Sequence, residues 1–433
     1  MKIQELYNLF LKTGSVSTDT RNIKQGSIFF ALKGDNFNGN KFVEEAIKLG
    51  AYCALTDEKE FENPGLRIYY TEDCLKTLQD LANYHRKKLN TPVISLTGSN
   101  GKTTTKELIA KVLSQKYNLI ATHGNLNNHI GVPITLLSLK YYHELAIVEM
   151  GANHLNEIDF LCKIAEPDLG YITNFGKAHL EGFGGVEGVI KGKSELYHYL
   201  KKNNKTVFVN CDDKKQSELT EEMERISFGE CENSDFKFSY TDNHPGLCPF
   251  LTYENKTIKS QLTGSYNITN VAAAVAIGLH FKVPFDHIKR AIESYQPDNN
   301  RSQIIEKGKY KIILDAYNAN PSSMEAALNN FKLIEGDKMI ILGDMFELGE
   351  NSDNEHIKIV EMAEKLNFNK IFLIGQHFSK INQNEFTNLK IFENRQAAED
   401  YFKNNKPESK NLLIKGSRGM ALEKLLDFID FEY

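Results

Sequence analysis

Short apolar runs that alternate with helix-like segments constrain the fold of this chain more than any other feature. Such runs are typical of buried parallel strands, and the longer amphipathic segments between them are typical of crossover helices. The pattern therefore predicts an α/β protein with mostly parallel sheets. The clearest predicted strands are residues 93–97, 145–150, 169–173, 206–210, 311–317, 339–345, 371–375 and 412–416.

The pattern also divides the chain, whose 433 residues are too many for one compact core. Residues 1–90 carry one clear apolar run, 27–32, and no phosphate-binding loop. A polar seam at residues 294–303 interrupts the later alternation, which then resumes. We therefore predict three domains, at residues 1–90, 91–297 and 298–433.

Composition excludes several classes of protein. The formal net charge of -5 argues against a nucleic-acid partner. No apolar run approaches the roughly 20 residues of a membrane span, and the N-terminal segment MKIQELYNLF lacks the features of a signal peptide. The six cysteines are scattered without a C-x-x-C pair, which favours reduced thiols in the cytosol over a disulfide or zinc framework.

The stretch LTGSNGKTTTK, residues 96–106, predicts a phosphate-binding loop. An apolar strand precedes it and a helix-like segment follows, so backbone N–H groups and a helix N-terminus would face an anion. Lys102 would neutralise the phosphate and Thr103 could bind Mg²⁺. Because Leu96 stands where the longer motif has its first glycine, an ordinary strand-to-helix turn remains an alternative. The predicted nucleotide contacts are Gly98, Ser99, Asn100, Gly101, Lys102, Thr103 and Thr104.

Polar motifs follow several predicted strands at the end where ligands bind in open α/β sheets. Glu149 and Asn174 follow strands of the central part, and Asp315 and Lys415 follow strands of the last third. This arrangement predicts one site shared between two domains, although each motif taken singly could also be the polar start of a loop.

Four further side chains could serve a metal. Glu149 could face a Mg²⁺ ion, or it could cap a loop. His179 lies in the glycine-rich segment NFGKAHLEGFGG, and a lone histidine is more often structural than a ligand. Lys191 and Lys193 straddle a glycine in IKGKSEL. A desolvated lysine is a free amine that can react with CO₂ to form a carbamate, an anion able to bind Mg²⁺, but a surface charge is the simpler interpretation.

Together these motifs resemble the Mur ligase family, the ATP-dependent amide-bond ligases of peptidoglycan synthesis. The resemblance covers essentially the whole chain, and G-x-x-G-K-T is that family's form of the phosphate loop. The most specific segments are GNLNN at 124–128, HIGVP at 129–133, EMGANH at 149–154, YNANP at 317–321 and GDMFELG at 343–349. Relatives that add other amino acids carry a histidine motif where this chain reads YNANP.

The resemblance implies a small α/β domain that binds the UDP end of the substrate, a central ATPase domain and a Rossmann-like third domain. It implies ATP and two Mg²⁺ ions as cofactors, with Lys102, His179 and a carbamylated Lys193 as catalytic residues. The implied metal ligands are Thr103, Glu149, His179 and Lys193, and the implied nucleotide contacts also include Asn267, Asn270, Arg301 and Asp315. The implied substrate contacts are Ser17, Thr18, Asp19, Arg21, Asn127, Asn128, Asn318 and Asn320. Where many relatives read D-G-H, this chain has Asn38-Gly39-Asn40, so a histidine contact is absent or replaced.

The implied reaction joins D-alanyl-D-alanine to UDP-N-acetylmuramoyl-tripeptide through an acyl phosphate, in a cytoplasmic monomer. A relative that adds a single amino acid is the nearer alternative, and a nucleotide-dependent binding protein without ligase activity is the more distant one. The sequence does not distinguish a lysine-containing from a diaminopimelate-containing tripeptide.

Overall fold

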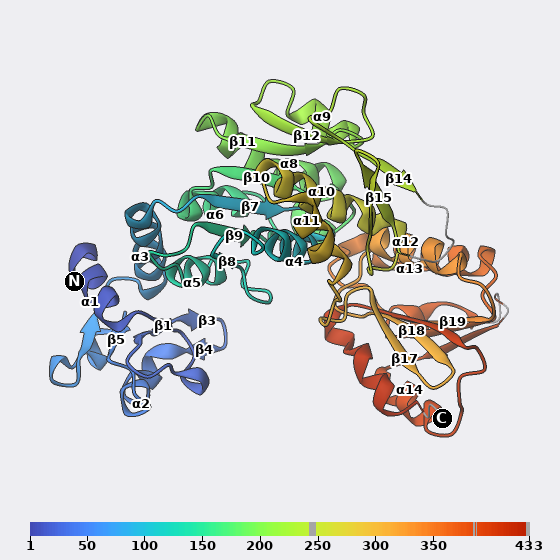
Figure 1. The fold of residues 1–433 in the computed structure, drawn as a ribbon. Coiled ribbons are helices and arrows are strands. Elements are labelled where there is room, and N and C mark those ends of the chain that lie inside the picture. Colours follow the sequence, from blue (N-terminus) through green and yellow to red (C-terminus); the bar gives the residue numbers. More distant parts are fainter. Residues whose placement is uncertain (242–247, 384–385, 387, 430–433) are drawn as a thin grey trace.

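The computed structural model describes residues 1–241, 248–383, 386 and 388–429. Three bodies follow one another along the chain, and the first and last lie on opposite sides of the central one (Figure 1). The sheets are largely parallel, so the predicted α/β class is confirmed.

The first body is built on a parallel sheet of order β1-β2-β5-β6, with a small antiparallel pair, β3 and β4, beside it. Helix α3 packs against α1 of the same body and against α5 and α6 of the central one, so it joins the two. The elements are α1 (Ile3–Thr13), β1 (Val16–Ser17), β2 (Ile28–Phe30), β3 (Lys33–Gly34), β4 (Phe37–Asn38), α2 (Val43–Lys48), β5 (Cys53–Thr56), β6 (Ile68–Tyr70) and α3 (Cys74–Leu89).

The central body is built on a parallel sheet of order β13-β12-β11-β10-β7-β9-β8. Its strands are β7 (Val93–Thr97), β8 (Leu119–Ala121), β9 (Leu145–Glu149), β10 (Leu169–Ile172), β11 (Thr206–Asn210), β12 (Arg225–Gly229) and β13 (Phe236–Lys237). A small antiparallel sheet adds β14 (Ser239–Thr241), β15 (Phe250–Tyr253) and β16 (Lys256–Lys259). The helices are α4 (Lys102–Leu113), α5 (Gly131–Leu137), α6 (Glu157–Ala165), α7 (Leu180–Phe183), α8 (Val186–Lys202), α9 (Lys214–Leu219), α10 (Ile268–His280) and α11 (Phe285–Glu293).

Strands β7 and β9 are buried at every position because helices cover both faces of the sheet. Ile94, Leu96 and Ile147 lie in one apolar cluster with residues of α4, α10 and α11. Val93 and Val148, on the other face, lie in a second cluster with residues of α5, α6 and α8. This double covering explains why the strands appear in the sequence as continuous apolar runs.

The last body is built on a sheet of order β17-β18-β22-β19-β20-β21, in which only the β17–β18 pair is antiparallel among the described strands. Its strands are β17 (Gln303–Lys307), β18 (Tyr310–Asp315), β19 (Lys338–Gly343), β20 (Lys370–Ile374), β21 (Leu389–Phe392) and β22 (Asn411–Lys415). Its helices are α12 (Pro321–Lys332), α13 (Ser352–Lys365) and α14 (Arg395–Phe402).

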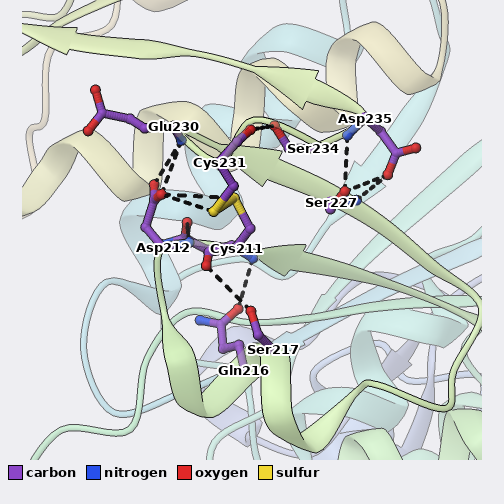
Figure 2. The surroundings of a disulfide bond; sticks show 10 residues. Cys211, Asp212, Gln216, Ser217, Ser227, Glu230, Cys231, Ser234 and Asp235 are labelled. Carbon is purple, nitrogen blue, oxygen red and sulfur yellow. Dashed lines mark hydrogen bonds between the residues drawn. A yellow bond between two sulfur atoms is a disulfide. The ribbon is translucent and has the colours of Figure 1, made fainter.

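The expectation of reduced cysteines is wrong for one pair, because Cys211 and Cys231 form a disulfide (Figure 2). Cys211 follows β11 and Cys231 follows β12, and these strands are parallel neighbours, so their carboxyl ends meet. A search for closely spaced cysteines misses a pair that adjacent parallel strands bring together. The other cysteines are free thiols, of which Cys53, Cys74 and Cys162 are buried.

Candidate functional site

A cavity of about 580 Å³ lies between the central and last bodies. The phosphate-loop segment and α10 contribute from one side, and the segments before β17 and after β18 contribute from the other. The cavity brings together these predicted site residues: Ser99, Asn100, Gly101, Lys102, Thr103, Thr104, Asn127, Asn128, Glu149, His179, Asn267, Asn270, Arg301, Asp315, Asn318 and Asn320. The expectation of a site shared between two domains agrees with this geometry.

The predicted phosphate loop connects β7 to α4 and depends on two glycines. Gly98 and Gly101 have φ angles of 140° and 78°, which favour glycine. A Cβ on Gly98 would lie 2.0 Å from Oγ1 of Thr173, and one on Gly101 would lie 2.5 Å from Oδ1 of Asn270. Asn270 also accepts a hydrogen bond from Thr105 at 3.0 Å. Helix α10 therefore packs too closely over the loop for any larger residue.

Lys102 begins α4 and folds back over its own loop. Its Nζ donates to the backbone carbonyls of Gly98 at 2.7 Å and Ser99 at 3.3 Å. Desolvation lowers the pKa of Lys102 to about 8, with Glu149 opposing that shift and Arg301 adding to it. The amine thus lies among backbone oxygens at the mouth of an anion-binding turn.

Glu149 ends β9 and is 1% exposed. Its Oε1 accepts hydrogen bonds from Thr103 Oγ1 at 3.2 Å and Asn127 Nδ2 at 2.8 Å. Its Oε2 is buried and has no hydrogen-bond partner among the described residues. A buried carboxylate oxygen without a donor is costly unless a cation or ligand meets it. The oxygens of Glu149 and Thr103, with His179 in the same cavity, fit a Mg²⁺ site.

Lys193 lies on α8 and is completely buried, whereas Lys191 on the same helix is exposed. Its Nζ donates to the carbonyl of Ala152, a cavity-lining residue, at 2.9 Å and lies 4.9 Å from the ring centre of Phe183. Burial, and then the positive charge of Lys102, hold the pKa of Lys193 well below its usual range. The side chain therefore lies behind the cavity wall, where burial favours the neutral amine.

The last body contributes an arginine stacked on an aromatic ring and a buried ion pair. The guanidinium of Arg301 lies 3.6 Å from the ring centre of Tyr317. Its buried Nε has no hydrogen-bond partner within the described part of the chain. Lys415 Nζ donates to Asp315 at 2.6 Å, and Asp315 also accepts from the backbone N–H of Ser302.

Asn320 links the two sides of the cavity directly. Its Nδ2 donates to Oδ1 of Asn100 in the phosphate loop at 2.8 Å, and its Oδ1 caps the start of α12. Asn318 accepts from the backbone N–H of Ala319. Asn267 donates to the carbonyl of Thr263 and accepts from Asn270.

His179 contacts the last body rather than Glu149. Its Nδ1 lies within ion-pair distance of Glu347 Oε2, and this interaction holds the pKa of the Glu347 carboxyl below its usual range. The GDMFELG motif was singled out in the sequence, but spacing gives no sign of this contact. Sequence reasoning also missed the lining residues His129, Glu157, Tyr266, Ser322 and Ser323.

The predicted substrate residues of the first body lie apart from this cavity. Ser17 ends β1, and its hydroxyl donates to the carbonyl of Asp19, whose carboxylate pairs with Arg21 at 2.7 Å. Thr18 stands between them in the sequence. The loop therefore satisfies much of its polarity internally, and Arg21 is largely exposed.

Asn40, which stands in place of a histidine seen in many relatives, is completely buried. It donates to Asn38 at 3.0 Å and Asp57 at 2.8 Å, and it accepts from Thr56 at 2.6 Å and from the backbone N–H of Asp57 at 3.1 Å. These bonds join the segment after β4 to the end of β5, within the first body. Asn40 is therefore a structural replacement.

Comparison with known proteins gives matches along nearly the whole chain. Residues 12–86 match the model described as Mur ligase family, catalytic domain; residues 96–278 match the Mur ligase middle domain; and residues 300–418 match the Mur ligase, glutamate ligase domain. The UDP-N-acetylmuramoyl-tripeptide–D-alanyl-D-alanine ligase of Bacillus subtilis is 32% identical, over 95% of this chain and 92% of that protein.

Two solved structures are similar over comparable lengths. The crystal structure of MurF from Acinetobacter baumannii has a TM-score of 0.85 and 32% identity, covering 95% of this chain and 92% of that one. The structure of MurF ligase from Thermotoga maritima in complex with ADP has a TM-score of 0.84 and 26% identity, covering 96% and 97%. No helix among the described residues is long and apolar enough to cross a membrane.

Proposed function

This chain belongs to the Mur ligase family, and we propose that it joins D-alanyl-D-alanine to UDP-N-acetylmuramoyl-tripeptide in an ATP-dependent, ADP-forming reaction. The observation that carries the proposal is the shared cavity, in which the phosphate loop of one body faces the YNANP segment of another. Relatives named for this reaction align over nearly the full length of the chain. The division into domains at residues 1–90, 91–297 and 298–433 is part of the same proposal.

ATP would occupy the central part of the cavity. The phosphate loop and the N-terminus of α4 would receive its phosphates, with Lys102 supplying positive charge. Asn267 and Asn270 would lie toward the adenine, and Arg301 and Asp315 would contribute from the third domain. The solved relative from Thermotoga maritima, which contains ADP, supports nucleotide binding.

Mg²⁺ would be held by Thr103, Glu149 and His179, and we propose two ions. The fit rests on the buried Oε2 of Glu149, which lacks a donor among the described residues. When bound, Mg²⁺ neutralises charge on the transferring phosphoryl group. Glu149 and Thr103 need little rearrangement for this task, since a hydrogen bond already links them.

We propose that Lys193 carries a carbamate formed with CO₂. Its support is the depressed pKa, because the reaction needs the neutral amine and burial favours that form. The lone pair of Nζ would bond to the carbon of CO₂ as one C=O π bond breaks, and one proton would leave Nζ. The neutral amine would thereby become a carbamate anion that can serve the metal.

The substrates would then meet in sequence. The tripeptide carboxylate attacks the γ-phosphorus of ATP, ADP leaves, and an acyl phosphate forms. The amine of D-alanyl-D-alanine attacks the acyl carbon and phosphate leaves, so one amide bond is made for each ATP cleaved. Water would destroy the acyl phosphate, and docking of the third domain over the cavity would exclude it.

Binding of the substrates would be divided among the three domains. Ser17, Thr18, Asp19 and Arg21 would bind the UDP end, and Asn127 and Asn128 would contact the acceptor. Asn318 and Asn320 line the third-domain side of the cavity and would face the dipeptide. We propose a cytoplasmic monomer, in keeping with ATP and a UDP-linked precursor as substrates.

A substrate panel tests the proposal. Purified protein with ATP, Mg²⁺ and UDP-N-acetylmuramoyl-tripeptide would receive D-alanyl-D-alanine, meso-diaminopimelate, L-lysine or glutamate in turn. Mass spectrometry should find a new peptide product only with the dipeptide, together with ADP. A product with a single amino acid would identify a different ligase, and ATP hydrolysis without product would indicate a nucleotide-binding protein.

A further inference from the structure

The loop at residues 174–181, which we call the docking loop, carries several contacts to the third domain. The backbone N–H of Lys177 donates to Oγ of Ser322 at 2.8 Å, and Lys177 Nζ lies 3.7 Å from Glu355 Oε2. A Cβ on Gly176 would lie 3.3 Å from the same Ser322 oxygen. The third domain therefore contacts this loop from both α12 and α13.

The same loop meets the GDMFELG motif through His179. The imidazole Nδ1 is buried and lies within ion-pair distance of the Glu347 carboxylate, its charged neighbour, although it has no aligned hydrogen-bond partner among the described residues. Two residues further along, the backbone N–H of Glu181 donates to the carbonyl of Glu347 at 3.3 Å. The side chain and the main chain of Glu347 therefore both contact the docking loop. These two contacts fix the position of the GDMFELG segment relative to that loop.

Both partners have unusual backbone conformations. His179 has a φ angle of 53° and Glu347 one of 63°, in the left-handed region that is unfavourable for a non-glycine residue. Such conformations persist where surrounding contacts hold them. The pair therefore has its geometry imposed by the two loops around it.

The contact determines what the imidazole can do. A carboxylate at Nδ1 favours the tautomer in which Nδ1 carries the proton and donates it, so Nε2 keeps a free lone pair. Histidines that bind metals usually donate their other ring N–H to such an acceptor, which fixes the ring and raises its basicity. His179 lines the cavity, so a free Nε2 would be available to a cation there.

We propose that Glu347 is a positioning residue: the third domain brings its carboxylate to Nδ1 of His179 and so holds Nε2 ready for the cation. The inference rests on the proposed function, in which His179 serves Mg²⁺. In this inference the GDMFELG motif positions His179, and the cation site is complete only when the third domain is docked.

Glu355 provides a matched control. It also reaches the docking loop from the third domain, but through Lys177 rather than through the imidazole. Glu355→Gln removes one charged contact to the docking loop, while the contacts of Ser322 and Glu347 to that loop remain, so the state of His179 should not change. Glu347→Ala removes the acceptor, and Glu347→Gln keeps an oxygen acceptor while removing its charge.

The first test observes the imidazole itself. Nitrogen-15 labelled histidine spectra of the full-length, metal-free protein with saturating ADP would report the tautomer, and His179→Asn would identify the signal. Wild type and Glu355→Gln should show the Nδ1–H form. Glu347→Ala should shift to the Nε2–H form, and Glu347→Gln should lie between them. An Nε2–H tautomer in wild type, or an unchanged signal in Glu347→Ala, would overturn the inference.

The second test uses Mn²⁺ as a probe. Electron paramagnetic resonance should show binding about 10–100-fold weaker in Glu347→Ala, as is typical when such an outer partner is lost, and near wild type in Glu355→Gln. Equal affinity in wild type and Glu347→Ala would contradict the inference. If wild type does not join D-alanyl-D-alanine to the tripeptide, the proposed function is refuted instead. Failure of the positioning role and failure of the proposed function therefore give different results.

Discussion

Asn40 of the first domain and Glu149 of the central domain are both buried polar side chains, but their surroundings differ. Neighbours within the first domain satisfy Asn40 as both donor and acceptor. Glu149 has one oxygen bonded by Thr103 and Asn127 and a second oxygen without a donor among the described residues. A buried polar group whose hydrogen bonds are all made within the protein stabilises the fold. A buried polar group that lacks a hydrogen-bond partner at a cavity marks a place for a ligand.

Lys193 should give the largest effect. Lys193→Ala should be nearly inactive, because the proposed carbamate has no substitute, while Lys191→Ala should keep most activity because that side chain is exposed. Steady-state turnover in bicarbonate buffer checks both, and acetate should partly restore Lys193→Ala. Near-wild-type turnover in Lys193→Ala would contradict the inference that this buried lysine takes part in the reaction.

Lys102 should follow. Lys102→Ala should lower turnover about 10²–10³-fold, since one preorganised positive charge is lost at the transferring phosphoryl group. Folding stability should change little, because the amine contacts only carbonyls of its own loop among the hydrogen bonds of the described residues. Lys111→Ala, an exposed position on the same helix, is the control. Near-normal turnover in Lys102→Ala would rule out the phosphate-loop interpretation.

Asn40 should show the opposite behaviour. Asn40→Ala would leave the N–H of Asp57 without its acceptor and the hydroxyl of Thr56 with only the longer bond to the carbonyl of Glu58. The free energy of unfolding should fall by about 3 kcal/mol, measured by urea denaturation. Turnover at saturating substrates should stay within about twofold, because the lost bonds lie inside the first domain and touch no cavity residue. A large loss of turnover with unchanged stability would place Asn40 in the reaction.

The pH dependence of Lys193 should give the smallest effect. Burial lowers its pKa in the folded state, so the unfolded chain, with a pKa of about 10.4, binds more protons between the two values. Stability from this group therefore rises with pH over that range, and the penalty is full below the folded pKa. Lys193→Met should stabilise the bicarbonate-free protein more at about pH 6.5 than at about pH 9.5. An equal gain at both values would contradict the depressed pKa.

Much of the fold could be predicted because buried parallel strands leave an apolar signature. β7, β9, β10 and β11 lie within predicted runs, and β18 and β19 each begin one residue before theirs. Strand β12 was missed because its first residue is exposed and only its last two are buried. The antiparallel strands β14 and β16 likewise mix polar with apolar residues.

The site could be predicted only in part. Residues that share a motif, such as Lys102 and Thr103, were found because local spacing places them together. The contact of His179 with Glu347, and the disulfide between Cys211 and Cys231, depend on how domains dock and strands neighbour each other. Spacing along the chain carries no record of either. The role of Asn40 also required its partners to be known, since a buried asparagine and a ligand-binding one look alike in sequence.

Glu149→Gln tests the central claim most directly. Glutamine keeps the shape and one oxygen acceptor for Thr103 and Asn127, but removes the charge at the unsatisfied position. Measured together, the free energy of unfolding should stay equal or rise, while turnover should fall by about 100-fold or more at ordinary Mg²⁺. A loss of stability with turnover within about threefold of wild type would show that Glu149 serves the fold, and would contradict the account.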